Sequence, residues 1–378
     1  MNQFNTLYHL IFIVKIKNNM TICIIGNSLT ALTLAKALTK QNIYVDVLYE
    51  KKILNINKNR TIGISKSNID YINKNIVNIN KLLWKIKKIE IFSDTLKKEE
   101  LINFDKSNDQ VLSIIKNHNL YKKLNSDLYK NKYFKSKFIQ IKNLSCLEKY
   151  DLVVNCDSRN IITKKYFNNK IEKKYNSRAY TTIIKHEKIL NNVAVQIFTN
   201  KGPLAFLPIS ETKTSVVYSI SSSINKKKVN IEKLINNKNY KYKIINIEKI
   251  NNFELKFSNL RKYYHENILA FGDLLHTIHP LAGQGFNMTI RDINLFLDIV
   301  KNKLNLGLPL DKSVNIEFQN RAKHKNLIFS NGVDLIYEFF NFERKTNNKF
   351  LSKSVQLISR NSKLNKFFSK IADKGVLF

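Results

Sequence analysis

The most constraining feature of the sequence is a cluster of glycines in the segment 267–292, NILAFGDLLHTIHPLAGQGFNMTIRD. The chain has only nine glycines in 378 residues, yet Gly272, Gly283 and Gly285 fall within one window of 14 positions. Glycines placed this densely in a glycine-poor chain indicate a backbone that approaches another group closely or adopts positive φ.

Regular structure is expected on both sides of these glycines. Ile268 to Phe271 form an apolar run that predicts a buried strand, and Asp273 follows at its carboxyl end, the edge where open α/β sheets bind ligands. The amides of the next helix's first turn would face an anion or a carbonyl-rich ring edge. That helix is predicted from about Gly285 because apolar residues recur at steps of three and four: Phe286, Ile290, Ile293, Leu297, Val300 and Leu304.

The series GDLLHTIHPLAGQGFN resembles the second flavin-contacting motif of the FAD-dependent aromatic hydroxylases, which have the p-hydroxybenzoate hydroxylase fold. It is most similar to the ubiquinone-biosynthesis branch of that family. The resemblance implies that Asp273 hydrogen-bonds the ribityl chain of FAD and that Pro280 lies beside the isoalloxazine ring. It also implies that the amides of Phe286 and Asn287 hold the pyrimidine edge. The glycines of the same cofactor-binding set are Gly272, Gly283 and Gly285.

A second candidate cofactor motif lies near the start of the chain. A strand over 21–25, a helix to about residue 40 and a strand over 45–49 have the layout of a dinucleotide-binding βαβ unit. Gly26 opens the turn, and Glu50 is placed to accept hydrogen bonds from the adenosine ribose. Ser28 stands where a second glycine lets the backbone reach the pyrophosphate, and Ala31 occupies the third glycine position.

Two further segments resemble cofactor-contacting elements of the same family. Arg60, in NRTIGIS, resembles the arginine that follows the second strand and reaches the flavin side of FAD; the alternative is a surface arginine. Asp157 lies among the polar residues that end a buried strand predicted within 150–159, and it resembles the aspartate of the DG motif, close to the FAD pyrophosphate and the nicotinamide path. Ser158 replaces the glycine of that motif, which puts FAD affinity or reductant handling in doubt.

A proline-bounded stretch, GPLAFLP at 202–208, is similar to the GPxAxLP element of the ubiquinone hydroxylases. The resemblance places Phe206, Leu207 and Pro208 at the sheet that roofs the ring-binding cavity. Antiparallel strands are predicted around it at 181–184, 193–198 and 215–220. The plainer alternative is that GP and LP only end strands.

The formal net charge of +35 raises the question of nucleic-acid binding. Only eight of the 64 basic residues are arginines, however, and specific base recognition relies on the arginine fork. We therefore expect no specific nucleic-acid partner. The basic surface would still favour anionic membranes.

The cysteine usage suggests a cytoplasmic protein, with peripheral contact at the inner membrane as the sharper alternative. The three cysteines, Cys23, Cys146 and Cys156, have no CxxC spacing and predict neither a disulfide nor a metal site. Residues 1–19 are too short and too interrupted to span a bilayer, so a mis-set start codon or an extension is expected. The membrane-facing candidate is a basic amphipathic helix with Leu364, Phe367, Phe368 and Ile371 opposite Lys363, Lys366, Lys370 and Lys374.

The expected fold is α/β: a Rossmann-like FAD-binding domain interleaved with an antiparallel-sheet substrate domain and followed by a helical C-terminal segment. The FAD-binding domain is expected from 20–75, 145–165 and 262–320, the substrate domain from 76–144 and 166–261, and the C-terminal helices from 321–378.

The resemblance implies a monooxygenase that hydroxylates the ring of a polyprenylated phenol in ubiquinone biosynthesis through a flavin C4a-hydroperoxide. FAD is the cofactor, O2 the co-substrate and NAD(P)H or a protein electron donor the reductant; other ubiquinone-biosynthesis enzymes are candidate partners. No conventional catalytic residue is expected. His279 is a candidate for a proton role, with a packed structural role as the stronger expectation. Two alternatives stay open: a non-catalytic scaffold with eroded glycine motifs, and a flavin reductase of the same fold.

Overall fold

The computed structural model describes residues 20–50, 58–96, 99–105, 110–141, 143–221, 230–346, 352–356 and 362–375. The predicted extension at 1–19 lies outside these ranges. So do the side chains of Leu364, Phe367 and Phe368, on which the prediction of an amphipathic C-terminal helix depended.

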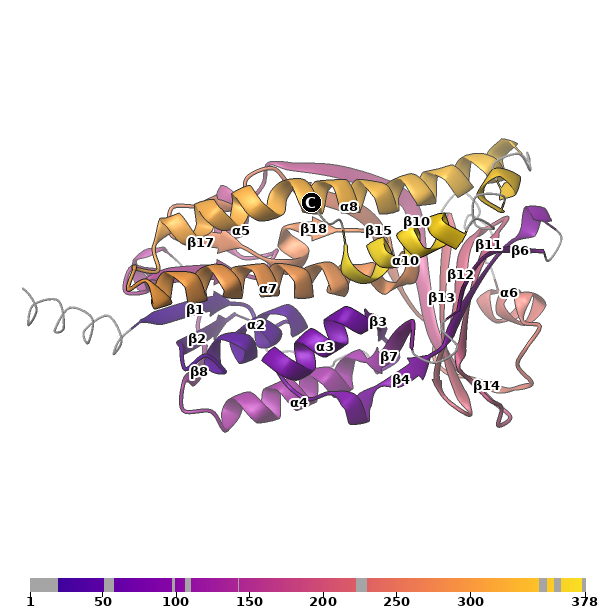
Figure 1. The fold of residues 1–378 in the computed structure, drawn as a ribbon, viewed down its shortest axis with the longest axis horizontal. Helices are drawn as coiled ribbons and strands as arrows, with labels where there is room; N and C mark the ends of the chain where they lie inside the picture. The colour runs from indigo at the N-terminus through magenta and orange to yellow at the C-terminus, as the bar shows by residue number, and fades with distance from the viewer. Residues whose placement is uncertain are drawn as a thin grey trace, which may run out of the picture.

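A six-stranded sheet forms one layer of the molecule (Figure 1). Its strands are parallel except at the β16 edge, and their apolar runs are buried because helices cover both faces. The order is β16 (Tyr264–His265), β17 (Ile268–Ala270), β9 (Leu152–Asn155), β1 (Thr21–Ile25), β2 (Tyr44–Tyr49) and β8 (Phe134–Phe138).

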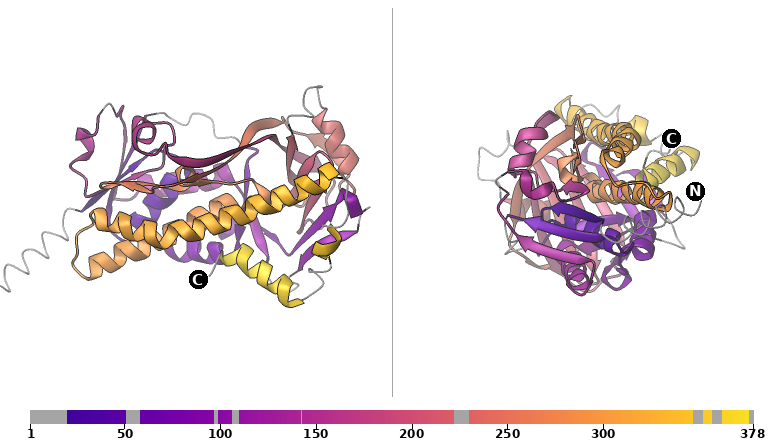
Figure 2. Two further views of the ribbon diagram at one scale, coloured as in Figure 1. Left: turned by 90° about the horizontal axis from the view of Figure 1, so that it is seen from above. Right: turned by 90° about the vertical axis from the view of Figure 1, so that its left-hand side faces the viewer.

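Several helices pack around this sheet, and some of them begin directly at the turns that follow its strands. Helix α2 directly follows the β1 turn and packs against both α4 and α7. Helix α8 runs along α7 and over the ends of both large sheets (Figures 1 and 2). Their bounds are α2 (Leu29–Thr39), α3 (Lys66–Asn75), α4 (Asn117–Tyr129), α5 (Ile161–Tyr166), α7 (Gln284–Asn305), α8 (Lys312–Thr346) and α10 (Ser362–Lys374).

A nine-stranded, mostly antiparallel sheet forms the second layer. Helix α6 (Ile231–Lys238) packs on its outer face, and its inner face is turned toward the six-stranded sheet and its helices (Figure 1). The main path runs through β18 (His276–Thr277), β15 (Asn251–Leu260), β10 (Lys170–His186), β13 (Lys213–Ser221), β12 (Gly202–Ser210), β11 (Val193–Thr199), β5 (Lys88–Ser93) and β6 (Glu100–Asp105), with β14 (Ile244–Ile247) paired to β10.

A three-stranded sheet joins the two layers. It consists of β3 (Thr61–Ser65), β7 (Leu112–Lys116) and β4 (Trp84–Ile86). The hydroxyl of Thr61 donates to Ser215 Oγ at 2.9 Å, and Ile86 and Ile114 pack beside Leu207 of the large sheet.

The predicted fold class is confirmed, but the chain is divided differently from the expectation. Residues 76–144 were expected to lie wholly in the substrate domain, whereas β8 pairs with β2 and α4 packs on α2. The many charged residues of this segment obscured the helical spacing of three leucines that are buried in the structure, Leu120, Leu124 and Leu128. Likewise, α8 crosses the expected boundary at residue 320.

Candidate functional site

Three glycines with positive φ bring separate turns together at the carboxyl edge of the six-stranded sheet. Gly26 has φ 107°, Gly272 has φ 66° and Gly283 has φ 67°. A methyl group built on Gly26 would lie 3.4 Å from Cβ of Asp157, and one on Gly272 would lie 2.6 Å from Cγ2 of Thr30. The turns that follow β1, β9 and β17 are therefore in van der Waals contact.

Gly283 and Gly285 have different surroundings, although they are two residues apart. A methyl group on Gly283 would lie 3.0 Å from the backbone nitrogen of Gly63 in β3. A methyl group on Gly285, in the first turn of α7, would meet only Cγ1 of Ile278, at 3.9 Å. The packing of the protein itself requires glycine at 283 but not at 285. The space beside Gly285 is thus the part of this turn that an external group can approach.

The side chain of Asn287 ties the second glycine turn to β3 and α3. Its Oδ1 accepts from the amide of Ser65 at 3.0 Å and from Nδ2 of Asn68 at 2.9 Å, while its Nδ2 donates to the carbonyls of Gly63 at 3.0 Å and Gly283 at 3.3 Å. The sequence had indicated only a backbone role for Asn287. Its side-chain partners in β3 and α3 were missed because they lie more than 200 residues away in the chain.

Ser28 caps the helix that follows Gly26. Its backbone is extended and its Oγ accepts a hydrogen bond from the amide of Ala31 at 3.3 Å. Ala31 is fully buried in the main core, so it serves the close helix-sheet packing expected of the third glycine position. Ser28 consequently satisfies one amide of the helix N-terminus internally.

Asp157 lies in a turn that its own hydrogen bonds fix. Its amide donates to Oδ1 of Asn155 at 3.1 Å, and its Oδ1 accepts from the amide of Arg159 at 2.9 Å. The hydroxyl of Thr163 donates to the Asp157 carbonyl at 2.6 Å. The loop after β9 is therefore held by side chains from α5, a feature that the sequence motif did not reveal.

Asp273 is exposed at the start of the second glycine turn, where only its carbonyl is engaged, by the hydroxyl of Thr277 at 3.0 Å. The carboxylates of Asp273 and Asp157, together with burial as the largest cause, raise the pKa of the Cys156 thiol. Two carboxylates predicted from separate motifs thus both act on the pKa of one thiol. Further along the loop, Pro280 and Phe286 are half-buried.

The remaining predicted cofactor residues stand further from this cluster of turns. The Glu50 carboxylate, at the end of β2, accepts from the amide of Ile141 at 3.1 Å. Arg60 is exposed just before β3, and its carbonyl accepts from the amide of Asn117 at 3.0 Å. The structure does not join the Arg60 side chain to the glycine turns.

His279 is buried between two tyrosines. Its ring stacks on Tyr337 of α8 at 4.3 Å between centroids and meets Tyr175 of β10 edge-on at 5.2 Å. Among the residues that the structure describes, neither ring nitrogen has a hydrogen-bond partner, and burial lowers the pKa of His279 to about 3. The imidazole is neutral at physiological pH, as the packed structural role requires.

A buried polar network next to this histidine was not predicted. His276 Nε2 lies 2.7 Å from Oδ2 of Asp292, whose Oδ1 accepts from Nδ2 of Asn326 at 2.9 Å. These contacts fasten the loop to α7 and α8. In the sequence, the presence of His276 and Asp292 in the same motif was the only indication of this contact.

The expected cavity wall at 206–208 is corrected by the structure. These residues form strand β12, in which successive side chains point to opposite faces. Phe206 is buried in the apolar cluster beneath α6, whereas Leu207 packs beside β4 and β7. Phe206 and Pro208 therefore lie on the outer face of the sheet, on which α6 packs, and Leu207 lies on the inner face.

The residues at the carboxyl edge fit FAD in part. The uncrowded position of Gly285, the amide-bearing start of α7 and the exposed Asp273 carboxylate are compatible with a flavin ring and its ribityl chain. Ser28 fits the pyrophosphate less well than glycine, because its side chain occupies the helix N-terminus.

Sequence comparisons give partial matches, and no family model matches the chain. The 3-demethoxyubiquinol 3-hydroxylase of Escherichia coli (strain K12) is 31% identical over 152 residues, which cover 38% of this chain and 39% of the relative. Ubiquinone biosynthesis monooxygenase COQ6, mitochondrial, of Schizosaccharomyces pombe is 22% identical over 273 residues, covering 60% and 57%. The chain thus spans between about two fifths and three fifths of the length of these relatives.

Solved structures match over nearly the whole chain. The p-nitrophenol 4-monooxygenase PnpA from Pseudomonas putida DLL-E4 covers 94% of this chain and 98% of its own, with a TM-score of 0.75 and 11% identity. The probable FAD-dependent monooxygenase pqsL from Pseudomonas aeruginosa covers 89% and 99%, with a TM-score of 0.69 and 14% identity. These comparisons confirm the resemblance indicated by the motifs: the chain has the fold of the FAD-dependent aromatic hydroxylases, and its sequence is similar to their ubiquinone-biosynthesis branch.

Proposed function

We propose that this protein is an FAD-dependent monooxygenase that hydroxylates the aromatic ring of a polyprenylated phenol in ubiquinone biosynthesis. The observation that carries the proposal is Gly285, a position where a methyl group would meet only ordinary contact, with Ile278 at 3.9 Å among the described residues, so that the protein's own packing does not require glycine. It lies among turns whose other glycines, Gly26, Gly272 and Gly283, are closely packed. The names of the matched relatives supply the reaction and the substrate class.

In this proposal the two carboxylates of the turns hold the polar part of the cofactor. Asp273 accepts from the ribityl hydroxyls, Asp157 lies near the pyrophosphate, and Glu50 binds the adenosine ribose. Pro280 borders the isoalloxazine ring, and the amides of Gly285, Phe286 and Asn287 bind its pyrimidine edge. Arg60 would have to turn inward from its exposed position to reach the flavin.

FAD, when bound and reduced, supplies the chemistry with O2. The chain's contribution is to position the ring and to exclude water. Ile278, Leu281 and Met288 place apolar side chains around the loop, next to the neutral His279. A neutral, buried histidine removes a proton source from this region, which favours coupled hydroxylation over loss of oxidant to solvent.

The substrate's apolar chain suggests a membrane-side partner, and we propose peripheral contact through α10. Lys363, Lys366, Lys370 and Lys374 are exposed on this helix. Their charges complement an anionic lipid surface. Among the described residues, none of the helices combines the length and apolarity needed to cross a bilayer.

We further propose a functional division along the sheets. The six-stranded sheet with its helices, including α4 and β8, would hold FAD. The nine-stranded sheet would cover the substrate ring with its inner face, and α8 would bridge the two.

The first test is the absorbance spectrum of the purified full chain with and without added FAD. We expect bound flavin bands near one equivalent, and we expect Asp273→Ala to weaken FAD binding about tenfold or more, because it removes a charge-assisted hydrogen-bond acceptor. Asp298→Ala, at an exposed position on α7, is the matched control and should retain FAD fully. An absence of flavin at every FAD concentration would favour the scaffold alternative.

The reaction is tested with 18O2 and a short-chain prenylated phenol. Incorporation of one labelled oxygen into the ring supports the hydroxylase. A reduced product without new oxygen supports the reductase of the same fold.

A further inference from the structure

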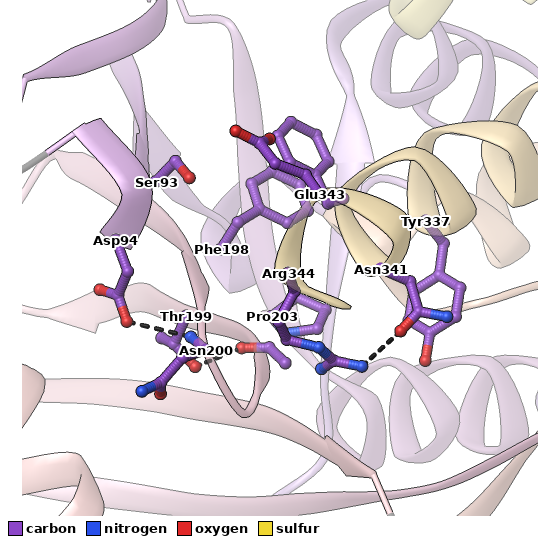
Figure 3. Close-up of a pocket in the computed structure, with 12 residues that line it drawn as sticks. Ser93, Asp94, Phe198, Thr199, Asn200, Pro203, Tyr337, Asn341, Glu343 and Arg344 are labelled. Carbon is purple, nitrogen blue, oxygen red and sulfur yellow. Dashed lines mark hydrogen bonds between the residues drawn. The ribbon is translucent and has the colours of Figure 1, made fainter. Parts of the chain in front are cut away.

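A pocket of about 230 Å³ lies apart from the glycine turns, between the β11–β12 connection and the end of α8 (Figure 3). It opens on the inner face of the nine-stranded sheet, because Phe198 pairs with Pro203 across β11 and β12, and Pro203 shares its face with Leu207. The volume corresponds to roughly seven or eight liquid water molecules at about 30 Å³ each. It suits a single substituted ring and is too small for a nucleotide.

Aromatic side chains form one wall of this pocket. The rings of Phe198 and Phe340 are stacked with centroids 3.6 Å apart and planes inclined by 14°. Tyr337 and Pro203 extend the wall. Such a surface favours a flat apolar body, which stacks on ring faces or packs edge-on against them.

The pocket is also lined by an arginine, Arg344, for which the described residues provide no carboxylate partner. Within the described part of the chain, the guanidinium of Arg344 donates from Nη2 to Oδ1 of Asn341, and no ion pair is formed with it (Figure 3). A guanidinium has five N–H donors, so most of its donor capacity remains for a ligand.

The two carboxylates that line the same pocket are engaged elsewhere. Asp94 pairs with Lys238 at 2.8 Å and accepts from the amide of Asn200 at 3.0 Å. Glu343 is buried and accepts from the hydroxyl of Ser352 at 2.6 Å. Figure 3 shows the Glu343 carboxylate on the far side of the pocket from the guanidinium. Neither acid neutralises Arg344, which therefore provides the positive charge of this cavity.

We propose that this pocket binds a small carboxylate with an apolar body of about one ring, with the carboxylate on Arg344 and the body against Phe198, Phe340 and Tyr337. A planar carboxylate matches the two parallel N–H donors of a guanidinium. The far side of Tyr337 stacks on His279, so the same tyrosine ring borders both the pocket and the loop between the glycine turns. The pocket lies apart from the glycine turns, so its ligand would be additional to the ring bound beside the flavin in the proposed hydroxylase.

The experiment is a fluorine NMR titration of the full-length protein with 4-fluorobenzoate and, separately, with neutral 4-fluorobenzamide. We expect saturable binding of the benzoate and binding of the amide at least about tenfold weaker. Arg344→Met keeps most of the side-chain length but removes the charge, and it should lower benzoate affinity to that of the amide. Phe340→Leu should weaken both ligands several-fold.

Lys345→Met is the matched control, because it removes the same charge from the exposed neighbouring position and should leave both affinities unchanged. The proposal is overturned if benzoate does not saturate below about 10 mM, since a weaker interaction carries no specific site. It is equally overturned if Arg344→Met binds benzoate like the unmodified protein, or if Lys345→Met loses as much affinity as Arg344→Met. The titration requires neither FAD nor turnover, so it succeeds or fails separately from the proposed hydroxylase.

Discussion

The two glycine turns at the carboxyl edge of the parallel sheet are held by different means. The second turn contains Gly272 and Gly283, whose missing side chains leave room for Thr30 and Gly63, and it is tied to β3 by Asn287. In the first turn, only Gly26 has positive φ, and Ser28 caps the helix with its own hydroxyl. Glycine thus occurs at Gly26, Gly272 and Gly283, where other parts of the protein pack closely against the backbone. A residue with a side chain, Ser28, occurs at the helix N-terminus, where only a bound ligand would require the space. Intact glycines in the second turn are evidence for the fold more than for FAD, with Gly285 as the exception.

The largest expected effect separates the two turns by their hydrogen bonds. Asn287→Ala should lower the free energy of unfolding by about 4 kcal/mol, because it leaves several buried donors and acceptors of β3 and α3 unpaired. Urea denaturation measures the change, and Asn294→Ala on the exposed face of the same helix is the control. A loss below about 1 kcal/mol would mean that the turn does not depend on this side chain.

The second turn should also make the protein acid-sensitive. The folded pKa of His279, about 3, lies below its usual value of 6.5, so the unfolded chain binds more protons between these values. Stability from the neutral histidine is present above about pH 6.5 and is lost as the pH falls, by up to about 1.4 kcal/mol per pH unit. His279→Phe keeps an aromatic ring against Tyr337 and should flatten this part of the pH dependence. Equal slopes in both proteins would contradict the neutral buried state.

Gly272→Ala tests the close approach of the two turns directly. We expect a loss of about 2 kcal/mol, because alanine must adopt a φ of 66° and its methyl group would lie 2.6 Å from Thr30. Thr30→Ala in the same chain should recover part of the loss, and a double-mutant cycle measures the coupling. If the two losses simply add, the turns are not in contact in solution.

Substitutions of Ser28 should divide stability from cofactor affinity. Ser28→Ala should cost about 1 kcal/mol of unfolding free energy by removing the helix cap, whereas Ser28→Gly should cost only a few tenths. The glycine variant should also bind FAD more tightly, because it opens the helix N-terminus to the pyrophosphate. Flavin fluorescence titration compares the two, and weaker FAD binding in Ser28→Gly would show that the hydroxyl itself contacts the cofactor.

The smallest effect on stability is expected at Gly285. Gly285→Ala should leave the protein unchanged or stabilise it by less than about 1 kcal/mol, because alanine is the better helix residue and its methyl group would make only an ordinary contact with Ile278 at 3.9 Å. FAD affinity should nevertheless fall. Loss of stability with unchanged FAD affinity would show that glycine is required at 285 by the packing of the protein, as it is at Gly283, and not by FAD.

Local structure could be predicted from the sequence wherever a short stretch determines it. The strand at 21–25 and the helix after the second glycine turn occur where apolar spacing indicated them. The fold class followed from these elements and from the family resemblance. Each of them depends on neighbours within a few residues, which a single sequence records.

Features that depend on distant partners could not be predicted. The alternation of β12 separates Phe206 from Leu207, but the sequence does not state which face is covered by α6. The distant hydrogen-bond partners of the Asn287 side chain belong to β3 and α3, and the Glu50 carboxylate accepts from the amide of Ile141. Such contacts arise from the assembled layers, so a motif identifies the residue without its surroundings.

The smallest strand of the large sheet links the two layers mechanically. Strand β18 is part of the loop between Gly272 and Gly283, and it pairs through Thr277 and His276 with Ser258 and Asn259 of β15. The border of the nine-stranded sheet is therefore made from the same loop that presents the glycine turns. If binding of a ligand displaced that loop, the two residue pairs between β18 and β15 would transmit the displacement to β15. Amide hydrogen exchange in β15 would then report events that take place a full layer away.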